Sequence, residues 1–322
     1  MKVSVIIPVY NVSNYIEKSI VSICNQTMQE GVECIIVNDC TPDDSMAKVY
    51  NIIHNYTGAI EFKIINHDNN KGLAAARNSG MKVAKGDYVL HLDSDDFYDD
   101  SLIEDLYCSA VCHNSDVAIC DIYQTNIHDE SVYKVNTLPS REDYVKALLD
   151  RNYNLFLWNI WNKLIKRKLF VENEISWKEG INNGEDLLIC TKLFCFVNNV
   201  SKVNKPLYHY THYNMNSFSN TTDIMENELH IIEEITDFFK KKGLYNKYIE
   251  NICFRKLSAK LTLLSSEQGF SNLDYHRLFP EANKYIYKHP RISFLPKLKL
   301  YISSLNPKFY VFLHKLLKHH DS

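Results

Sequence analysis

Residues 88–96 have the sequence YVLHLDSDD, an apolar run that leads directly into a cluster of acids. The apolar part is typical of a buried strand, and Asp93, Asp95 and Asp96 follow where that strand ends. In open α/β sheets, ligands bind beyond the carboxyl ends of the strands. Carboxylates this close repel one another, and a hard cation such as Mg²⁺ or Mn²⁺ would compensate. The alternative is an ordinary loop whose acids cap the helix expected from Asp99.

Strand and helix patterns alternate through the first 120 residues. Short runs rich in β-branched residues predict strands at 3–9, 33–38, 62–66, 88–92 and 116–120. Helices are predicted between them, beginning at a Ser13 cap, beginning at Asp43 or Asp44, and over 72–83 and 99–113. Such alternation implies βαβ units, so the expected fold class is α/β with a mainly parallel sheet covered on both faces.

The pattern loosens after residue 120. Helices are predicted over 141–149, 161–170 and 185–197, an extended segment over 200–210, and two long amphipathic helices over 223–268 divided near Gly243. We expect a domain over residues 1–220, with halves 1–120 and 121–220, followed by a helical region over 221–322.

Composition narrows the class of protein. The chain has 322 residues, 45% of them hydrophobic, and a net charge of −3, which argues against a disordered chain and against a polybasic nucleic-acid binder. Its nine cysteines form no C-x-x-C pair, so we expect reduced, buried thiols and no zinc ribbon. No apolar run approaches the length of a transmembrane helix. A cytoplasmic protein is expected.

The charge is unevenly distributed. Residues 282–320 carry eight Lys and Arg and no acid, which leaves −11 for the rest of the chain. The apolar run 309–313 lies within this basic segment. A basic amphipathic segment with aromatic residues is typical of a helix that lies on a membrane surface. We therefore expect peripheral contact with the inner face of the membrane; a solvated helix or one that packs in a homodimer is the alternative.

Two further strand ends carry polar groups. Asp39 can accept a hydrogen bond from a base N–H or a ribose hydroxyl, or else belongs to a plain turn and helix cap. Gly72 opens a helix of small residues, and Arg77 can reach an anion or a strand-end carboxylate. The chain has neither G-x-G-x-x-G after its first strand nor G-x-x-x-x-G-K-[ST], which argues against a dehydrogenase and a P-loop NTPase.

The order and spacing of four motifs resemble the family 2 glycosyltransferases of GT-A fold. These motifs are VSVIIPVYN at 3–11, VND at 37–39, NKGLAAARN at 70–78 and DSDD at 93–96. Three more, WNIWNKL at 158–164, GED at 184–186 and PLYHY at 206–210, are similar to the acceptor half of bacterial members that build surface polysaccharides. The resemblance covers residues 1 to about 220 and implies a GT-A domain there, with a mixed, mainly parallel sheet flanked by helices. The C-terminal helical extension is expected from its amphipathic pattern instead.

The resemblance also implies roles for the matching residues. Residues Pro8, Val9, Tyr10 and Asp39 would hold the uracil, Arg77 would lie near the base and diphosphate, and Asp93 would face the ribose. Residue Asp95 would bind Mn²⁺ or Mg²⁺, with His209 as a further metal ligand or, alternatively, a packed strand residue. Residues Glu185 and Trp158 would contact the acceptor, although Trp158 and Trp161 are equally consistent with core packing. Lys163 and Lys166 are expected to be solvated.

Asp186 is the expected catalytic base. It lies at the start of a predicted helix, where the helix dipole favours an ionised carboxylate, although a simple helix cap is the alternative. The function expected is inverting, metal-dependent transfer of a hexose from a UDP-sugar to a hydroxyl of a lipid-linked saccharide in bacterial surface polysaccharide synthesis. A sugar-nucleotide nucleotidyltransferase and a non-catalytic sugar- or nucleotide-binding protein of the same fold are the competing hypotheses.

Overall fold

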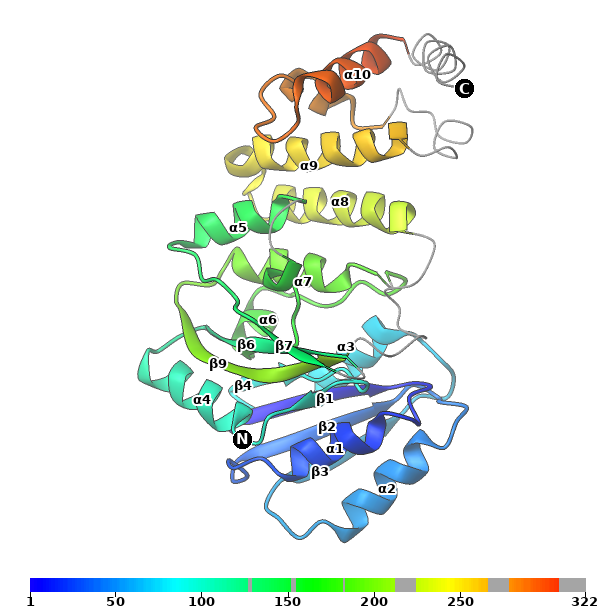
Figure 1. The fold of residues 1–322 in the computed structure, drawn as a ribbon, viewed down its shortest axis with the longest axis vertical. Coiled ribbons are helices and arrows are strands. Elements are labelled where there is room, and N and C mark those ends of the chain that lie inside the picture. The colour runs from blue at the N-terminus through cyan, green and yellow to red at the C-terminus, as the bar shows by residue number, and fades with distance from the viewer. Residues whose placement is uncertain (127–128, 152–154, 182, 212–223, 266–277, 307–322) are drawn as a thin grey trace. The chain divides into compact units, whose positions relative to one another are not determined.

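The computed structural model describes residues 1–126, 129–151, 155–181, 183–211, 224–265 and 278–306 (Figure 1). The chain divides into two compact units, which are described separately: residues 1–145 with 154–222, and residues 146–153 with 223–322.

The first unit begins with four parallel strands in the order β3-β2-β1-β4. The elements are β1 (Val3–Val9), α1 (Ile16–Cys24), β2 (Val32–Asn38), α2 (Ser45–Asn55), β3 (Glu61–Asn66), α3 (Leu73–Val83) and β4 (Tyr88–His91). The first four predicted strands are confirmed to within one residue, whereas the fifth, predicted over 116–120, continues to Thr125 in β6 (Val117–Thr125). Because β1 pairs with both β2 and β4, the strand order reverses there, and this is where an open α/β sheet binds ligands.

Close packing between α3 and the sheet positions the later site residues. Every residue of β1 is buried, which accounts for its unbroken apolar sequence. The facing side of α3 carries Ala76 and Gly80, and a Cβ at Gly80 would meet Ile6 Cγ2 at 2.5 Å. The small residues that the sequence places in this helix therefore bring its backbone close to the sheet.

The remaining strands make the sheet mixed, as expected for GT-A. Within the described residues, nine strands form one sheet in the order β3-β2-β1-β4-β8-β6-β9-β5, with β7 paired to β6. The added elements are β5 (Phe97–Tyr98), α4 (Leu102–Cys112), β6 (Val117–Thr125), β7 (Glu130–Tyr133), β8 (Lys163–Lys166), α6 (Lys168–Glu172), α7 (Glu185–Phe194) and β9 (Val200–Thr211). Strand β8 is antiparallel to both its neighbours, β4 and β6.

The predicted helix over 161–170 is wrong. Its middle, Lys163–Lys166, is strand β8, and the helix found here is only Lys168–Glu172. The apolar spacing of Trp161, Ile165 and Leu169 fits a helix, but the backbone of β8 completes the ladders of β4 and β6. Trp161 stacks on Tyr208 and Tyr210 with ring centroids 4.2 and 5.3 Å apart, so this tryptophan is a core residue.

The prediction that Lys163 is solvated is also wrong. Its side chain is fully buried, and its ammonium group donates to the carbonyl of Phe156 at 3.3 Å, to Asn162 Oδ1 at 2.7 Å and to the carbonyl of Asn159. An ammonium has three donors, and three oxygens accept them. Lys163 thereby holds the segment before β8 in place. Lys166, half-buried, pairs with Asp116 at 3.1 Å.

The expected Ser13 cap is wrong as well, because α1 begins at Ile16 and its N-cap residue is Tyr15. The backbone N–H of Ser13 instead donates to Asp43 Oδ2 at 2.8 Å, which ties the loop after β1 to the loop after β2. All nine cysteines are free, as expected, although Cys40, Cys108 and Cys112 are exposed rather than buried.

The second unit is helical. It includes the end of α5 (Arg141–Leu149) and contains α8 (Ile224–Lys241), α9 (Tyr245–Ser265), η3 (Pro280–Tyr285) and α10 (Phe294–Leu305). The two long helices divided near Gly243 are confirmed. Buried residues of α8, α9, η3 and α10, such as Ile232, Leu257 and Leu300, form one hydrophobic cluster. Among the described residues, no helix combines the length and apolarity needed to cross a membrane.

Candidate active site

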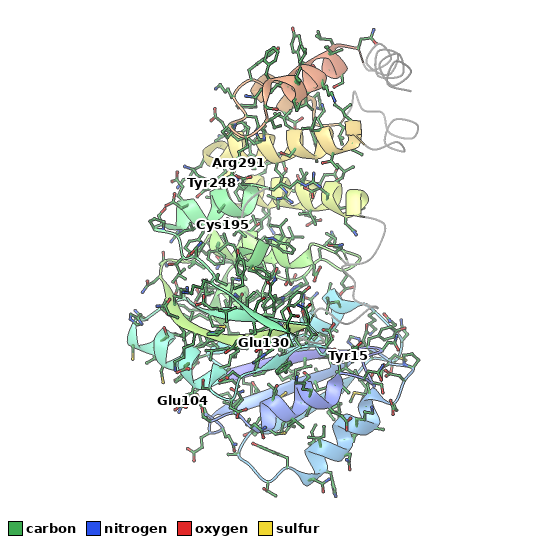
Figure 2. All side chains as sticks on the ribbon, viewed as in Figure 1. Tyr15, Glu104, Glu130, Cys195, Tyr248 and Arg291 are labelled. Atoms are coloured by element: carbon green, nitrogen blue, oxygen red, sulfur yellow. The ribbon has the colours of Figure 1, made fainter. Side chains whose placement is uncertain are left out.

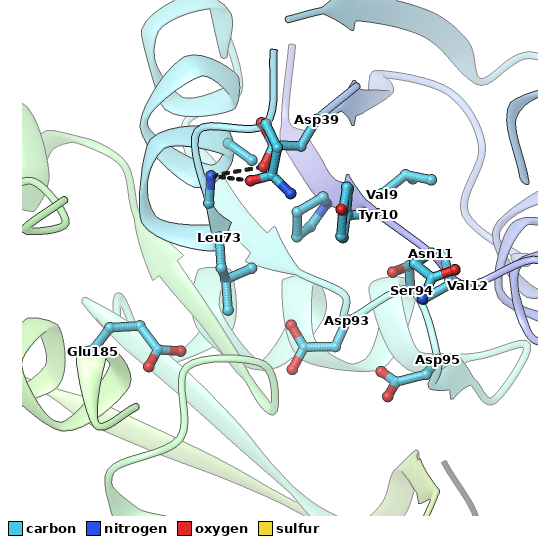
Figure 3. Close-up of a pocket in the computed structure, with 14 residues that line it drawn as sticks. Val9, Tyr10, Asn11, Val12, Asp39, Leu73, Asp93, Ser94, Asp95 and Glu185 are labelled. Atoms are coloured by element: carbon cyan, nitrogen blue, oxygen red, sulfur yellow. Dashed lines mark hydrogen bonds between the residues drawn. The ribbon is translucent and has the colours of Figure 1, made fainter. Parts of the chain in front are cut away.

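A pocket of about 270 Å³ lies beyond the carboxyl ends of β1, β2 and β4 (Figure 3). Seven of the site residues expected from the sequence line it: Pro8, Val9, Tyr10, Asp39, Asp93, Asp95 and Glu185. The other lining residues are Asn11, Val12, Asn70, Gly72, Leu73, Ala76 and Ser94. Of these, the sequence pointed only to Gly72 and the small residues after it, as a helix start that can approach a ligand. Asn11, Ala76 and Ser94 directly neighbour a predicted residue, and Asn70, Gly72 and Leu73 belong to the motif at 70–78, so membership of these motifs was the available signal.

Arg77 lies beneath the pocket rather than in its lining. The side chain is 1% exposed, and its guanidinium bonds three carboxylates: Asp93 at 2.8 Å, Asp186 at 2.7 Å and Glu185 at 3.1 Å. Burial by itself would lower the pKa of Arg77. The three carboxylates have the larger effect, so the pKa of Arg77 lies above its usual value. The arginine therefore joins the acid that follows β4 to the two acids that open α7.

Three carboxylates carry more negative charge than the one guanidinium can neutralise. This excess favours a proton on one of them. Burial raises the pKa of Glu185 to about 8; the charge of Asp186 adds to this effect and Arg77 opposes it. Burial also raises the pKa of Asp186, again against Arg77. The cluster can therefore hold a proton near neutral pH and release it under mildly alkaline conditions.

Both oxygens of Asp186 are held in place. Oδ1 accepts from Arg77, and Oδ2 accepts from the backbone N–H of Ile160 at 3.0 Å. Glu185 and Asp186 form the first turn of α7, behind Gly184, whose φ of 84° is in the left-handed region that glycine favours. The segment that Lys163 secures thus supplies the N–H that orients Asp186.

The acids after β4 differ in their surroundings. Asp93 and Asp95 line the pocket, whereas Asp96 is 3% exposed and accepts from Tyr208 Oη and the Thr211 N–H, both at 2.7 Å. Burial raises the pKa of Asp96 well above its usual range, and the charge of Asp95 adds to the shift. Asp96 therefore fastens the acidic turn to β9, and the other two acids face the pocket.

The structure does not bring His209 to the pocket. Its ring lies between Phe97 and Tyr123, with centroids 4.1 and 4.5 Å away, and its Nδ1 pairs with Glu130 at 2.9 Å (Glu130 is labelled in Figure 2). This is the packed strand residue of the alternative hypothesis. Trp158 is half-buried near Ile160 and does not line the pocket either.

The donor set fits a hard divalent cation. Among the described residues, no group of three or more His, Cys, Asp and Glu could hold a metal ion. Asp93 and Asp95 nevertheless both face the pocket, and Mg²⁺ is commonly held by one or two carboxylates together with substrate phosphates and water. The chemistry of these residues therefore suits a metal that arrives with a diphosphate.

The family model for glycosyl transferase family 2 matches residues 4–173, more than half of the chain. The chain belongs to glycosyl transferase family 2. The family predicted from the motifs is thus confirmed, and the matched residues include β1, β2, α3 and the acids after β4.

The chain is also similar to individual proteins, among them one relative in sequence and two solved structures. The chain is 32% identical over 188 residues to the poly(ribitol-phosphate) β-N-acetylglucosaminyltransferase TarP of Staphylococcus aureus, which covers 58% of this chain and 55% of TarP. The structure of S. aureus TarS 1–349 with UDP-GlcNAc has a TM-score of 0.63 at 20% identity and covers 94% of this chain and 91% of that one. The mannosyltransferase PcManGT of Pyrobaculum calidifontis, with GDP-Man and Mn²⁺, has a TM-score of 0.54 at 13% identity, with coverages of 95% and 88%.

These likenesses confirm the GT-A fold. The chain spans about 60% of the length of the first curated relatives that it matches.

The carboxylate cluster predicts a pH-dependent stability. Because the folded protein holds a proton on Glu185 that the unfolded chain has lost, the free energy of unfolding should fall as pH rises from 4.5 to about 8. The Glu185→Gln variant should lose this fall. Between these pH values, its free energy of unfolding should therefore increase by about 1 kcal/mol or more relative to that of wild type. Urea titrations at several pH values measure it.

Glu61→Gln, at an exposed position of β3, is the matched control and should follow the wild-type pH curve. Parallel curves for wild type and Glu185→Gln would contradict the raised pKa.

Proposed function

We propose that this chain transfers a hexose from a UDP-sugar to a hydroxyl of a saccharide acceptor, with inversion at the sugar, in the synthesis of a bacterial surface polysaccharide. The observation that carries the proposal is the Arg77 cluster, which joins Asp93 of the pocket to Glu185 and Asp186. One buried cation connects the acid expected on the donor side to the pair expected on the acceptor side.

The pocket offers suitable contacts for a nucleoside diphosphate. Asp39 provides a carboxylate for a base N–H, Pro8 and Tyr10 provide apolar surface, and Asp93 faces the same space for a ribose hydroxyl. A UDP-sugar donor is further supported by TarS, whose fold this chain shares and which was solved with UDP-GlcNAc.

Asp95, which lines the pocket beside Asp93, is the residue that would hold Mn²⁺ or Mg²⁺. When bound, the cation supplies positive charge to the diphosphate leaving group. PcManGT, solved with Mn²⁺, supports this assignment by fold. His209 has no part in the proposal, because its ring nitrogen pairs with Glu130 outside the pocket.

Asp186 is proposed as the base. The acceptor oxygen attacks the anomeric carbon from the face opposite the diphosphate, its proton passes to the Asp186 carboxylate, and the bond from the sugar to the diphosphate breaks. A single displacement of this kind inverts the configuration. The Ile160 N–H and Arg77 fix the carboxylate, so little rearrangement is needed at the moment of proton transfer. Glu185 lines the pocket, which supports the proposed contact with the acceptor.

The family assignment favours glycosyl transfer over the competing nucleotidyltransferase hypothesis. A non-catalytic binding protein is disfavoured for a physical reason. Three carboxylates around one buried arginine are costly to keep, and binding alone needs no base beside the donor pocket.

We further propose that α10 brings the protein to an anionic membrane, where a lipid-linked acceptor resides. Its exposed residues Phe294, Leu295, Leu298, Tyr301 and Leu305 occupy about 120° of the helix circumference. Lys297 and Lys299 lie on either side of this apolar stripe, and residues 282–306 include no acid. Lysines beside the stripe would repel a second copy and attract anionic lipid, which favours the membrane over the homodimer. The run 309–313 lies outside the described residues.

The base assignment predicts that Asp186→Asn abolishes transfer. Without a proton acceptor, kcat should fall roughly 10²- to 10⁴-fold, while UDP affinity stays within about threefold of wild type. The asparagine also leaves two carboxylates for Arg77, so the fold should persist. Product assays and calorimetry with UDP measure the two effects.

Asp100→Asn, an exposed carboxylate-to-amide change, is the matched control and should retain full activity. An active Asp186→Asn variant would remove Asp186 from the mechanism.

The metal assignment predicts the behaviour of Asp95→Asn. In wild type, Mn²⁺ should strengthen UDP binding; in the variant, that gain should fall about tenfold or more, because the ligand loses its negative charge. Affinity for UDP without metal should be unchanged. Calorimetric titrations with Mn²⁺ and with chelator decide the matter, and an unaltered Mn²⁺ effect would exclude Asp95 as a ligand.

The membrane proposal predicts that the triple variant Phe294→Ser, Leu298→Ser, Leu305→Ser loses about tenfold or more of its co-sedimentation with phosphatidylglycerol vesicles. Wild-type binding should weaken with added salt. The control variant Val83→Ser, Val111→Ser, Val171→Ser removes three exposed apolar residues elsewhere and should bind as wild type does. A triple variant that still sediments, or that instead loses self-association in sedimentation velocity, would overturn the proposal.

A further inference from the structure

Three side chains, those of Asp39, His67 and Ser79, form a hydrogen-bonded relay at the pocket. Asp39 and His67 are 3% and 9% exposed, and His67 Nδ1 lies 2.6 Å from Asp39 Oδ1. The other ring nitrogen, Nε2, lies 2.8 Å from Ser79 Oγ. Neither His67 nor Ser79 lines the pocket, and no motif of the sequence analysis pointed to a role for either.

The three residues of the relay come from three separate parts of the fold. Asp39 follows β2, His67 follows β3, and Ser79 lies within α3. The backbone N–H of His67 donates to the carbonyl of Asn38 at 2.9 Å, so the parallel pairing of β2 with β3 places the imidazole directly beside Asp39. The position of the histidine is therefore fixed by the sheet.

The hydrogen-bond directions follow from the carboxylate. An ionised carboxylate only accepts, so His67 Nδ1 carries the hydrogen and donates it to Asp39. The Nε2 atom is left to pair with the Ser79 hydroxyl. This second bond fixes the plane of the imidazole ring, and the ring in turn fixes the plane of the carboxylate.

Asp39 has one acceptor position left for a ligand. Its Oδ1 already accepts from His67 and from the Lys71 N–H at 2.8 Å, which fills two lone pairs. Its Oδ2 accepts only the Gly72 N–H among the bonds of the described residues, also at 2.8 Å (Figure 3). Since Asp39 lines the pocket, the remaining lone pair on Oδ2 is available there.

We infer that His67 and Ser79 are positioning residues for nucleobase selection: they orient Asp39 so that one lone pair of Oδ2 reads the ring N–H of uracil. This inference rests on the proposed UDP-sugar donor. Uracil presents a donor at N3, whereas cytosine presents an acceptor there. A carboxylate oxygen fixed toward that atom bonds uracil and repels cytosine, and a carboxylate free to turn away loses the distinction.

The test compares UDP with CDP binding by calorimetry in three single variants. His67→Leu removes both bonds and should lower the UDP-over-CDP affinity ratio about tenfold. In His67→Asn, the amide N–H occupies the place of Nδ1–H and keeps the bond to Asp39; this conservative variant should retain the ratio within about threefold. Ser79→Ala leaves the imidazole unanchored and should lower the ratio two- to threefold, roughly the effect of one neutral hydrogen bond.

Asp39→Asn supplies the reference. An amide can turn its N–H toward cytosine N3, so this variant should gain CDP affinity while losing UDP affinity. A purely structural role for His67 would lower the melting temperature and weaken both nucleotides equally, with the ratio unchanged. That result, or a ratio equal in His67→Leu and His67→Asn, overturns the inference. If His67→Leu does not fold, an unchanged ratio in Ser79→Ala overturns it instead.

Two failures remain distinguishable. If wild type binds neither UDP nor CDP, the proposed donor is wrong. If wild type prefers UDP and the His67 and Ser79 variants keep that preference, the donor stands and only the positioning role is lost.

Discussion

The buried guanidinium of Arg77 is the interaction on which the active-site region depends. It contacts Asp93, Glu185 and Asp186, residues that are up to 109 positions away in sequence. An arginine with 1% exposure is stable only when its charge is matched, and three carboxylates that converge there are stable only around a cation. Each side of the cluster thus requires the other, and together they bring the start of α7 to the end of β4.

Two other buried side chains hold the segments that carry this cluster. Lys163, saturated by three oxygens, secures the segment that offers the Ile160 N–H to Asp186. Asp96, held by Tyr208 and Thr211, fastens the acidic turn to β9. Side chains that do not line the pocket therefore determine where the reactive carboxylates lie, and this agrees with a site built in advance of its substrate.

Local patterns predicted the first half of the chain well. Strands β1, β2 and β4 are short and buried along almost their whole length, which favours apolar sequence, so their apolar runs identify them directly. The prediction for residues 161–170 was wrong because β8 is stabilised by its neighbours β4 and β6 rather than by its own pattern. The prediction that Lys163 is solvated was wrong for a similar reason. The local sequence does not indicate that three oxygens surround its ammonium group.

The sequence by itself determined the family, the α/β class and seven of the residues that line the pocket, because these follow from short motifs at the ends of regular strands. Only the tertiary structure decided that Arg77 is buried among three acids, that His209 pairs with Glu130 outside the pocket, and that His67 stands behind Asp39. The physical reason is that charge pairing and hydrogen bonding act over a few ångströms in space, whatever the separation along the chain.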